Sequence, residues 1–190
     1  MENTRAKTTR NSLILLLTAT IWGMAFVSQS KGMDYMHPFT FNGVRSLIGA
    51  AGILVYILIS RKIAGDKAAK LDWKLNVRAG LLCGIFLTIA STLQQFGIKY
   101  TSVGKAGFIT TLYIIFVPMF GIFLKKKVAP VVWAAAGMAA VGMYLLCMTE
   151  SLRLGAGDIM VFLCAIAFAI QIMTVDHYAA RIDGAVVSCI

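Results

Sequence analysis

The sequence predicts an all-α integral membrane protein that folds as a multi-span helical bundle. Hydrophobic residues make up 59% of its 190 residues, charged residues only 14%, and the mean hydropathy is +0.80. Water-soluble domains contain about 45–50% apolar and about 25% charged residues, so the bilayer is the expected solvent. The charged residues are also separated by long uncharged runs. Two of these runs have 20 residues, enough for a helix to cross a hydrocarbon core of about 30 Å.

The first three spans are predicted over residues 12–30, 38–60 and 79–98. They are uncharged apart from Arg45 in the second. Strands of a membrane barrel would alternate apolar and polar residues over about ten positions, and apolar runs such as residues 14–17 do not alternate. A cleaved signal peptide is the alternative for the first span, because basic residues precede it. The span is long enough to cross, however, and five others follow it.

Three further spans are predicted over residues 106–124, 129–149 and 158–176. Their uncharged runs are 19, 22 and 17 residues long. The fourth span contains Pro118, which removes one backbone hydrogen bond and is expected to kink the helix. After Asp183 the sequence is apolar again, so the start of another span is predicted at residue 184.

Lys and Arg residues are distributed unequally between the two ends of the predicted spans. One side has 13 of the 18, three of them within residues 1–10, and the other side has 4. The positive-inside rule therefore places the N-terminal segment 1–10 in the cytoplasm. The basic residues are dispersed over several loops and form no single patch. The pI near 9.7 is thus a topology signal, and nucleic acid is not a predicted partner.

Residue types that hold metals or perform catalysis do not cluster in this sequence. The four cysteines lie in or at the ends of apolar runs without paired spacing, and the two histidines lie next to predicted membrane boundaries. The cysteines are interpreted as small core residues, and no metal or cofactor is predicted. No Asp or Glu lies well inside a span, so the sequence predicts neither an intramembrane enzyme nor a coupling carboxylate in this stretch.

Polar residues inside the spans are the candidate functional groups, because each costs free energy in lipid unless it faces protein or water. In the third span, polar residues recur at steps of three and four residues and share one helical face; they are Thr88, Ser91, Thr92 and Gln95. The first, second and fourth spans carry polar residues as well. Together these stripes predict a cavity for a small solute. For any single Ser or Thr, the alternative is a hydrogen bond across helices or to its own backbone.

Arg45 is the only charged residue well inside a predicted span, away from its ends. It lies seven residues after Pro38, about 10 Å below the outer boundary if the helix begins at that proline. One interpretation is structural: the guanidinium reaches the lipid headgroups or bonds to carbonyls at neighbouring helix ends. The other is functional: the guanidinium is the counter-charge for a carboxylate or phosphate on a solute.

The sequence contains a weak internal repeat. An offset of 146 residues aligns Trp22-Gly23 with Phe168-Ala169 and the turn at His37-Pro38 with Asp183-Gly184. The repeating unit has five spans, an odd number, so its second copy would enter the membrane from the opposite side. Inverted repeats of this kind are common in secondary transporters.

Several of these features occur together in a known family. They are Trp22-Gly23, Pro38 followed by Arg45, the stretch 98–102, Pro118, the Ala/Gly-rich fifth span and Gly157-Asp158. In this order and spacing the sequence resembles the EamA-like permeases of the drug/metabolite transporter superfamily over nearly its whole length. The resemblance implies a bacterial inner-membrane permease of ten helices in two inverted five-helix repeats. Residues 11–149 would form the first repeat and residues 157–190 the start of the second.

The resemblance also implies a central cavity lined mainly by the first, third and fourth helices of each repeat. Carried over onto this sequence, the cavity residues are Trp22, Thr92, Gln95, Tyr113 and Gln171. The implied activity is alternating-access transport of amino acids, other small metabolites or drugs, often outward. The departure is length, because only one full repeat is present, and a fragment or a truncated gene product is therefore expected. The alternative functions are a non-transporting membrane subunit and an inactive truncated permease.

Overall fold

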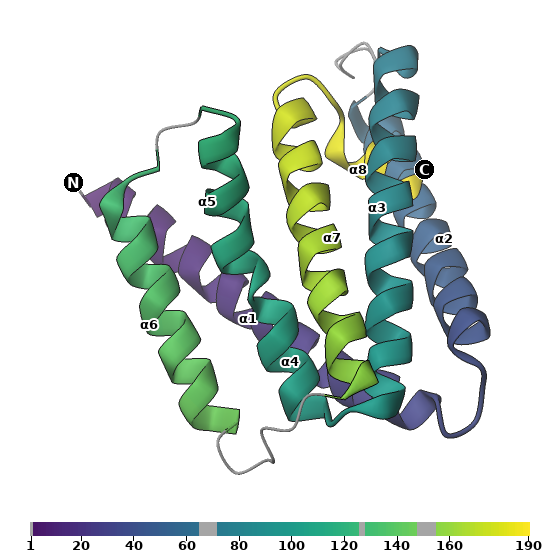
Figure 1. Ribbon diagram of the computed structural model, residues 1–190. Coiled ribbons are helices and arrows are strands. Elements are labelled where there is room, and N and C mark those ends of the chain that lie inside the picture. The colour runs from purple at the N-terminus through teal and green to yellow at the C-terminus, as the bar shows by residue number, and fades with distance from the viewer. Residues whose placement is uncertain (1, 65–71, 126–127, 148–154) are drawn as a thin grey trace.

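A computed structural model describes residues 2–64, 72–125, 128–147 and 155–190, and every regular element in these ranges is an α-helix (Figure 1). The helices are α1 (Glu2–Gly32), α2 (Pro38–Ala64), α3 (Trp73–Tyr100), α4 (Val103–Thr111), α5 (Tyr113–Phe123), α6 (Pro130–Cys147), α7 (Ala156–Tyr178) and α8 (Gly184–Cys189). Five stretches are long and apolar enough to cross a membrane: Thr8–Gly32, Pro38–Ile63, Trp73–Tyr100, Val103–Phe123 and Ala156–Tyr178. A shorter apolar helix covers Pro130–Gly142. The prediction of an all-helical, multi-span membrane protein is confirmed.

Helices α3 and α7 lie side by side and antiparallel at the centre of the bundle (Figure 1). Glycine permits their close approach near one end. A Cβ on Gly97 would lie 2.4 Å from Cγ2 of Val161, and a Cβ on Gly157 would lie 2.8 Å from the Gly97 carbonyl oxygen. Side chains would clash with the facing helix at both positions, so the two backbones meet where the sequence has glycine.

Two clusters of buried apolar residues hold α7 against its neighbours. One cluster joins Ala90 of α3 to Cys164 and Phe168 of α7. The other joins Ile98 of α3 and Ile109 of α4 to α7. Helix α7 therefore packs on α3 along one face and on α4 and α5 along another.

The helix ends are joined by polar contacts. At the end where α3 finishes, the Asp158 carboxylate accepts hydrogen bonds from the Thr101 hydroxyl and the Gly155 N–H, and it pairs with Lys105 at 2.8 Å. At the opposite end, Asn76 of α3 accepts a hydrogen bond of 2.9 Å from the N–H of Asp183. These contacts hold both ends of α7 in register with α3.

The predicted span 106–124 is two helices, α4 and α5, which meet at Leu112. The Leu112 N–H bonds to the carbonyl of Ile109, three residues back, while the Thr111 hydroxyl donates to the Gly107 carbonyl at 2.7 Å. Such hydroxyl bonds to the preceding turn often bend helices. The interruption lies six residues before Pro118, and Pro118 itself is buried inside α5.

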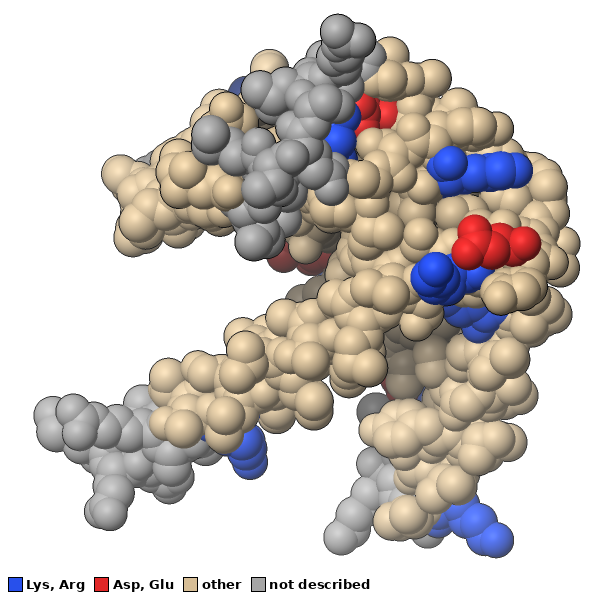
Figure 2. All heavy atoms as spheres, turned by 90° about the horizontal axis from the view of Figure 1, so that it is seen from below, with Lys and Arg blue, Asp and Glu red and all other residues tan. Residues whose placement is uncertain are grey.

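The outer helices expose wide apolar surfaces. Leu15 in α1, Leu47 in α2 and Met138 in α6 are 69%, 73% and 72% exposed. Figure 2, which views the molecule from below, shows nearly continuous uncharged surface with small groups of charged side chains, and recesses between the protruding helices. Contiguous apolar surface of this extent is suited to lipid or to a protein partner, and not to water.

Candidate functional site

Two neighbouring cavities lie on one side of the central helix pair. The larger, of about 430 Å³, is bordered by α2, α3, α7 and α8. The smaller, of about 230 Å³, is bordered by α1, α2, α3 and α7. Arg45, Leu87 and Ser91 line both cavities, and the two cavities together are called the Arg45 cleft. A space of this size has room for a small organic molecule.

Helices α2 and α3 together position the Arg45 side chain. Pro38 is the first residue of α2, a position that suits proline because its fixed φ matches the helix and no N–H is needed there. One turn before Arg45, the Asn42 amide donates to the Ser91 carbonyl of α3 at 3.2 Å. The side-chain oxygen of Asn42, Oδ1, then accepts a hydrogen bond from Arg45 Nη2 at 3.1 Å. Helix α3 thus orients Asn42, and Asn42 orients the guanidinium.

The positive charge of Arg45 has no carboxylate partner in the part of the chain that the structure describes. The ion pairs among these residues are Lys105 with Asp158 and Arg61 with Asp183. The nearest aromatic ring, that of Phe41, has its centroid 5.9 Å from Arg45 Cζ. A guanidinium has five N–H donors, and the Asn42 oxygen engages one nitrogen. The remaining donors are available to a bound molecule.

The other polar groups of the cleft come from five helices, with Gln29 of α1 and Ser188 of α8 among them. Ser46 of α2, Thr88 and Ser91 of α3 and Gln171 of α7 line the larger cavity with Arg45. The Ser91 hydroxyl donates to the Thr88 carbonyl at 3.3 Å, a weak local bond that a solute could replace. The apolar part of the wall is formed by Trp22, Phe26, Leu87 and Phe168.

The predicted site residues fall into two groups. The structure brings Trp22, Arg45 and Gln171 together in the walls of the cleft. Trp22 is 52% exposed there. Thr92 is half-buried and lines neither cavity of the cleft.

Gln95 and Tyr113 lie outside the cleft. Gln95 is fully buried between α3 and α1, where its amide donates to the Gln29 carbonyl at 3.5 Å and its Oε1 has no partner among the described residues. The Tyr113 ring lies behind the wall, 6.4 Å from the ring of Phe168. Tyr113 lines neither cavity and contacts the wall of the cleft at Phe168.

Several cleft residues were not among the predicted site residues. Thr88 and Ser91 belong to the polar stripe from which Thr92 and Gln95 were selected. Gln94 also lines the cleft, and its amide donates to the Thr110 hydroxyl of α4 at 3.2 Å. Gln94 was not part of the predicted stripe, because it points about 100° away from Gln95 and lies outside the arc that the four stripe residues share.

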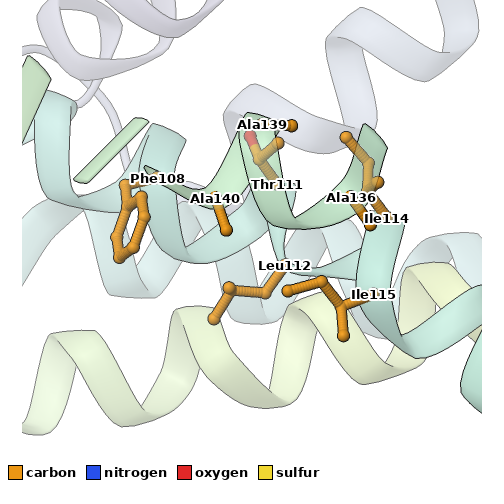
Figure 3. Close-up of a pocket in the computed structure, with 8 residues that line it drawn as sticks. All are labelled: Phe108, Thr111, Leu112, Ile114, Ile115, Ala136, Ala139 and Ala140. Atoms are coloured by element: carbon orange, nitrogen blue, oxygen red, sulfur yellow. The ribbon is translucent and has the colours of Figure 1, made fainter. Parts of the chain in front are cut away.

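Two further cavities are poorer candidates. Figure 3 shows a space between α6 and the α4–α5 junction, lined by residues such as Phe108, Leu112 and Ala139. Its volume of about 10 Å³ has room for about one water molecule. A groove of about 560 Å³ beside α5 and α7 is lined mainly by apolar residues, and the hydroxyl of its Thr174 bonds to the Ile170 carbonyl of its own helix.

Comparison with known proteins places the chain in a family. A profile of the EamA-like transporter family matches residues 10–148, most of the chain. The chain belongs to the EamA-like transporter family. It is also 30% identical over 171 residues to an uncharacterized transporter of Archaeoglobus fulgidus. No solved structure matches the chain.

This EamA-like chain spans about half the length of that curated relative. The alignment covers 87% of this chain and 48% of the relative. The family assignment confirms the resemblance to drug/metabolite transporter permeases. The assignment also agrees with the apolar helices in making this a multi-pass membrane protein.

Proposed function

We propose that this protein transports small organic solutes, such as amino acids, other metabolites or drugs, across the membrane through the Arg45 cleft, with export as the direction. The observation that carries the proposal is the cleft itself. Polar side chains from α2, α3 and α7 converge on a space of about 430 Å³ inside a bundle of apolar helices. Polar groups are costly in lipid and are retained mainly where they face water or a ligand. Membership of a transporter family supports the same function.

We infer alternating access as the mechanism, with α1–α6 as one repeat of five spans, in which α4 and α5 together form one span, and with α7–α8 as the start of a second, inverted repeat of a ten-helix fold. The helix directions support this. The Gln29–Gln95 contact joins the later turns of α1 to the later turns of α3, so these two helices run the same way. The Thr101–Asp158 contact joins the end of α3 to the beginning of α7. Helix α7 therefore runs opposite to α1, as an inverted repeat requires.

A transport assay tests the proposed function. The protein, reconstituted in liposomes, is assayed for uptake and efflux of a panel of labelled amino acids and organic acids. Ser91→Trp would place an indole in both cavities of the cleft and is expected to lower flux about tenfold or more, because the solute is excluded. Leu81→Trp, on a 56% exposed position of the same helix, is the matched control and should leave flux unchanged. Equal flux in the two variants would contradict the proposal.

The remaining parts of this proposal concern location. We infer that the protein resides in a bacterial inner membrane, in contact with lipid along α1, α2 and α6, with residues 1–10 in the cytoplasm. The exposed apolar faces of these helices support the lipid contact. The excess of Lys and Arg on one side supports the orientation.

A further inference from the structure

We propose that the Arg45 cleft selects solutes in which an oxyanion, either a carboxylate or a phosphate, is attached to a small apolar body, and that it rejects organic cations of the same size. This inference rests on the proposed function, because it assigns a solute class to the same cleft. The inference is narrower than the proposed function, because amino acids, metabolites and drugs include anions, zwitterions and cations, and the inference excludes organic cations.

The charge of the cleft is the first argument. Arg45 lines both cavities, and among the described residues neither cavity is lined by an Asp or Glu. A cation inside the cleft would meet a like charge with no carboxylate to offset it. An oxyanion would meet the guanidinium, which binds carboxylates and phosphates through paired N–H donors. The partly closed, low-dielectric setting increases both effects.

The fixed orientation of the guanidinium is the second argument. The Asn42 amide is held by the Ser91 carbonyl of α3 at 3.2 Å, and its oxygen holds Arg45 Nη2 at 3.1 Å. A flexible surface arginine would lose side-chain freedom on binding, whereas this arginine is already restrained by a contact between two helices. Restraint before binding lowers the entropic cost of association.

The aromatic lining of the smaller cavity is the third argument. Trp22, Phe26 and Phe168 surround the smaller cavity, which adjoins Arg45. Aromatic and aliphatic walls favour an apolar body. Gln171 and Ser46 lie in the larger cavity and can accept a hydrogen bond from an ammonium group, so a zwitterion is compatible with the site when its carboxylate is bound by Arg45.

Direct binding tests the inference with three size-matched probes: phenylacetate, phenylacetamide and 2-phenylethylammonium. The purified 190-residue protein carries Trp73→Phe and Trp133→Phe, so that the fluorescence reports Trp22 in the cleft, and calorimetry provides an independent readout. Phenylacetate is expected to bind at least about tenfold more tightly than the amide and the ammonium compound, as one charge-assisted bidentate contact predicts.

Arg45 variants identify the residue responsible. Arg45→Gln should weaken phenylacetate binding about tenfold or more and leave amide binding unchanged, while Arg45→Lys should give an intermediate loss because an ammonium lacks the planar fork. Arg78→Gln, an exposed position of α3 that lines neither cavity, removes the same charge and should change nothing. Equal binding of the three probes, or phenylacetate binding unaffected by Arg45→Gln, would overturn the inference.

Two further arms separate the possible sources of the oxyanion. Phenyl phosphate tests whether a phosphate replaces the carboxylate, and Arg45-dependent binding of either compound supports the inference. A short-chain phosphatidylglycerol carries a similar anion on a lipid. If only this lipid binds in an Arg45-dependent manner, Arg45 is a headgroup contact and the solute inference is wrong.

Flux measurements separate this inference from the proposed function. If the protein binds probes selectively by charge but moves no solute in liposomes, the proposed transport function is wrong and the inferred binding site is supported. If the protein moves solutes at rates that depend neither on solute charge nor on Arg45→Gln, the inferred selectivity for oxyanions is wrong and the proposed transport function is supported.

Discussion

Two charged side chains within the apolar helices, Arg45 and Asp158, have opposite environments. Asp158 is 3% exposed and is saturated by the Thr101 hydroxyl, the Gly155 N–H and the Lys105 ammonium. Arg45 is exposed to the cleft and has one side-chain hydrogen bond, to Asn42. A charge whose partners are all within the fold stabilises that fold, whereas a charge with donors to spare is available to a ligand. Asp158 therefore has a structural role, and Arg45 is the candidate binding residue.

Replacing Asp158 by Asn should destabilise the protein strongly. The change keeps the shape of the side chain but removes the carboxylate from a Lys105 ammonium whose side chain is only 18% exposed. Breaking a buried pair by removing one partner costs about 3–5 kcal/mol, and at about 2–4 °C per kcal/mol for a chain of this size the melting temperature in detergent should fall by about 6–20 °C. Circular dichroism at increasing temperature measures this.

The control for Asp158→Asn is the second ion pair. Arg61 and Asp183 are 42% and 43% exposed and 3.9 Å apart, so Arg61→Gln should cost less than about 1 kcal/mol. The double variant Lys105→Met, Asp158→Leu should be more stable than Asp158→Asn, because it leaves no buried charge. A melting temperature unchanged by Asp158→Asn would show that the pair contributes nothing.

At the scale of one helix, the faces of α3 have different neighbours and different roles. On one face, Gly97 and Ala90 pack against α7. On another face, Thr88 and Ser91 lie along the cleft. Gln95 is covered by α1. A single helix therefore carries the central packing surface, one wall of the cleft and the contact with α1.

Cysteine labelling should distinguish the face of α3 that lines the cleft from the face that is buried against α1. In a background without the four native cysteines, Ser91→Cys is expected to react with a water-soluble maleimide, because Ser91 lines both cavities. Gln95→Cys should react at least about tenfold more slowly, because position 95 is 0% exposed and thiols react only where reagent has access. Mass spectrometry of the labelled protein gives both rates. Equal labelling would place Gln95 in an open cavity and contradict the packing of α1 on α3.

These two residues show how far the sequence determines the site. The spacing from Ser91 to Gln95 places both on one face of a helix, and uncharged runs predict where that helix crosses the membrane. The spacing does not encode which neighbour lies beside each turn. Gln95 lies in the turn of α3 that α1 contacts through Gln29. Ser91 lies one turn earlier, where the larger cavity separates α3 from parts of α2 and α7. The same limit applies to the predicted span 106–124, whose spacing does not encode that α4 ends and α5 begins at Leu112, six residues before Pro118.

The contact between α3 and α7 should be sensitive to one methyl group. In Gly157→Ala the new Cβ would lie 2.8 Å from the Gly97 oxygen and from the Tyr100 carbonyl carbon, both backbone atoms. The helices must then separate, at a cost of about 1–3 kcal/mol. Gly137→Ala in α6 is the matched control, because nothing lies within 4 Å of its Cβ and alanine favours the helix by about 1 kcal/mol. Thermal unfolding of both variants should show opposite shifts, and a stable Gly157→Ala protein would argue against this backbone contact.

For the whole molecule, the contacts at the two ends of the α3–α7 pair fix which loops share a compartment. The Asp158 contacts join the 101–105 turn to the beginning of α7. The Asn76 contact joins the beginning of α3 to the 179–183 turn, where Arg61 of α2 also reaches Asp183. The first set must lie on one side of the membrane and the second on the other. If residues 1–10 lie in the cytoplasm, as we propose from the excess of basic residues, the 179–183 turn is expected on the cytoplasmic side as well.

Labelling from the two sides of the membrane tests this arrangement. With the four native cysteines removed, Tyr35→Cys, in the turn between α1 and α2, is 88% exposed and should be labelled in intact cells by a membrane-impermeant maleimide. Arg181→Cys, in the turn after α7, should be labelled only after the membrane is permeabilised, because the helix contacts put it at the opposite end. The expected contrast is nearly complete, since the reagent cannot cross a hydrocarbon core of about 30 Å. Labelling of both positions from outside would mean either a mixed orientation or that α7 does not cross. A reversed pattern would instead leave the α3–α7 contacts intact and show that the positive-inside rule fails for this chain.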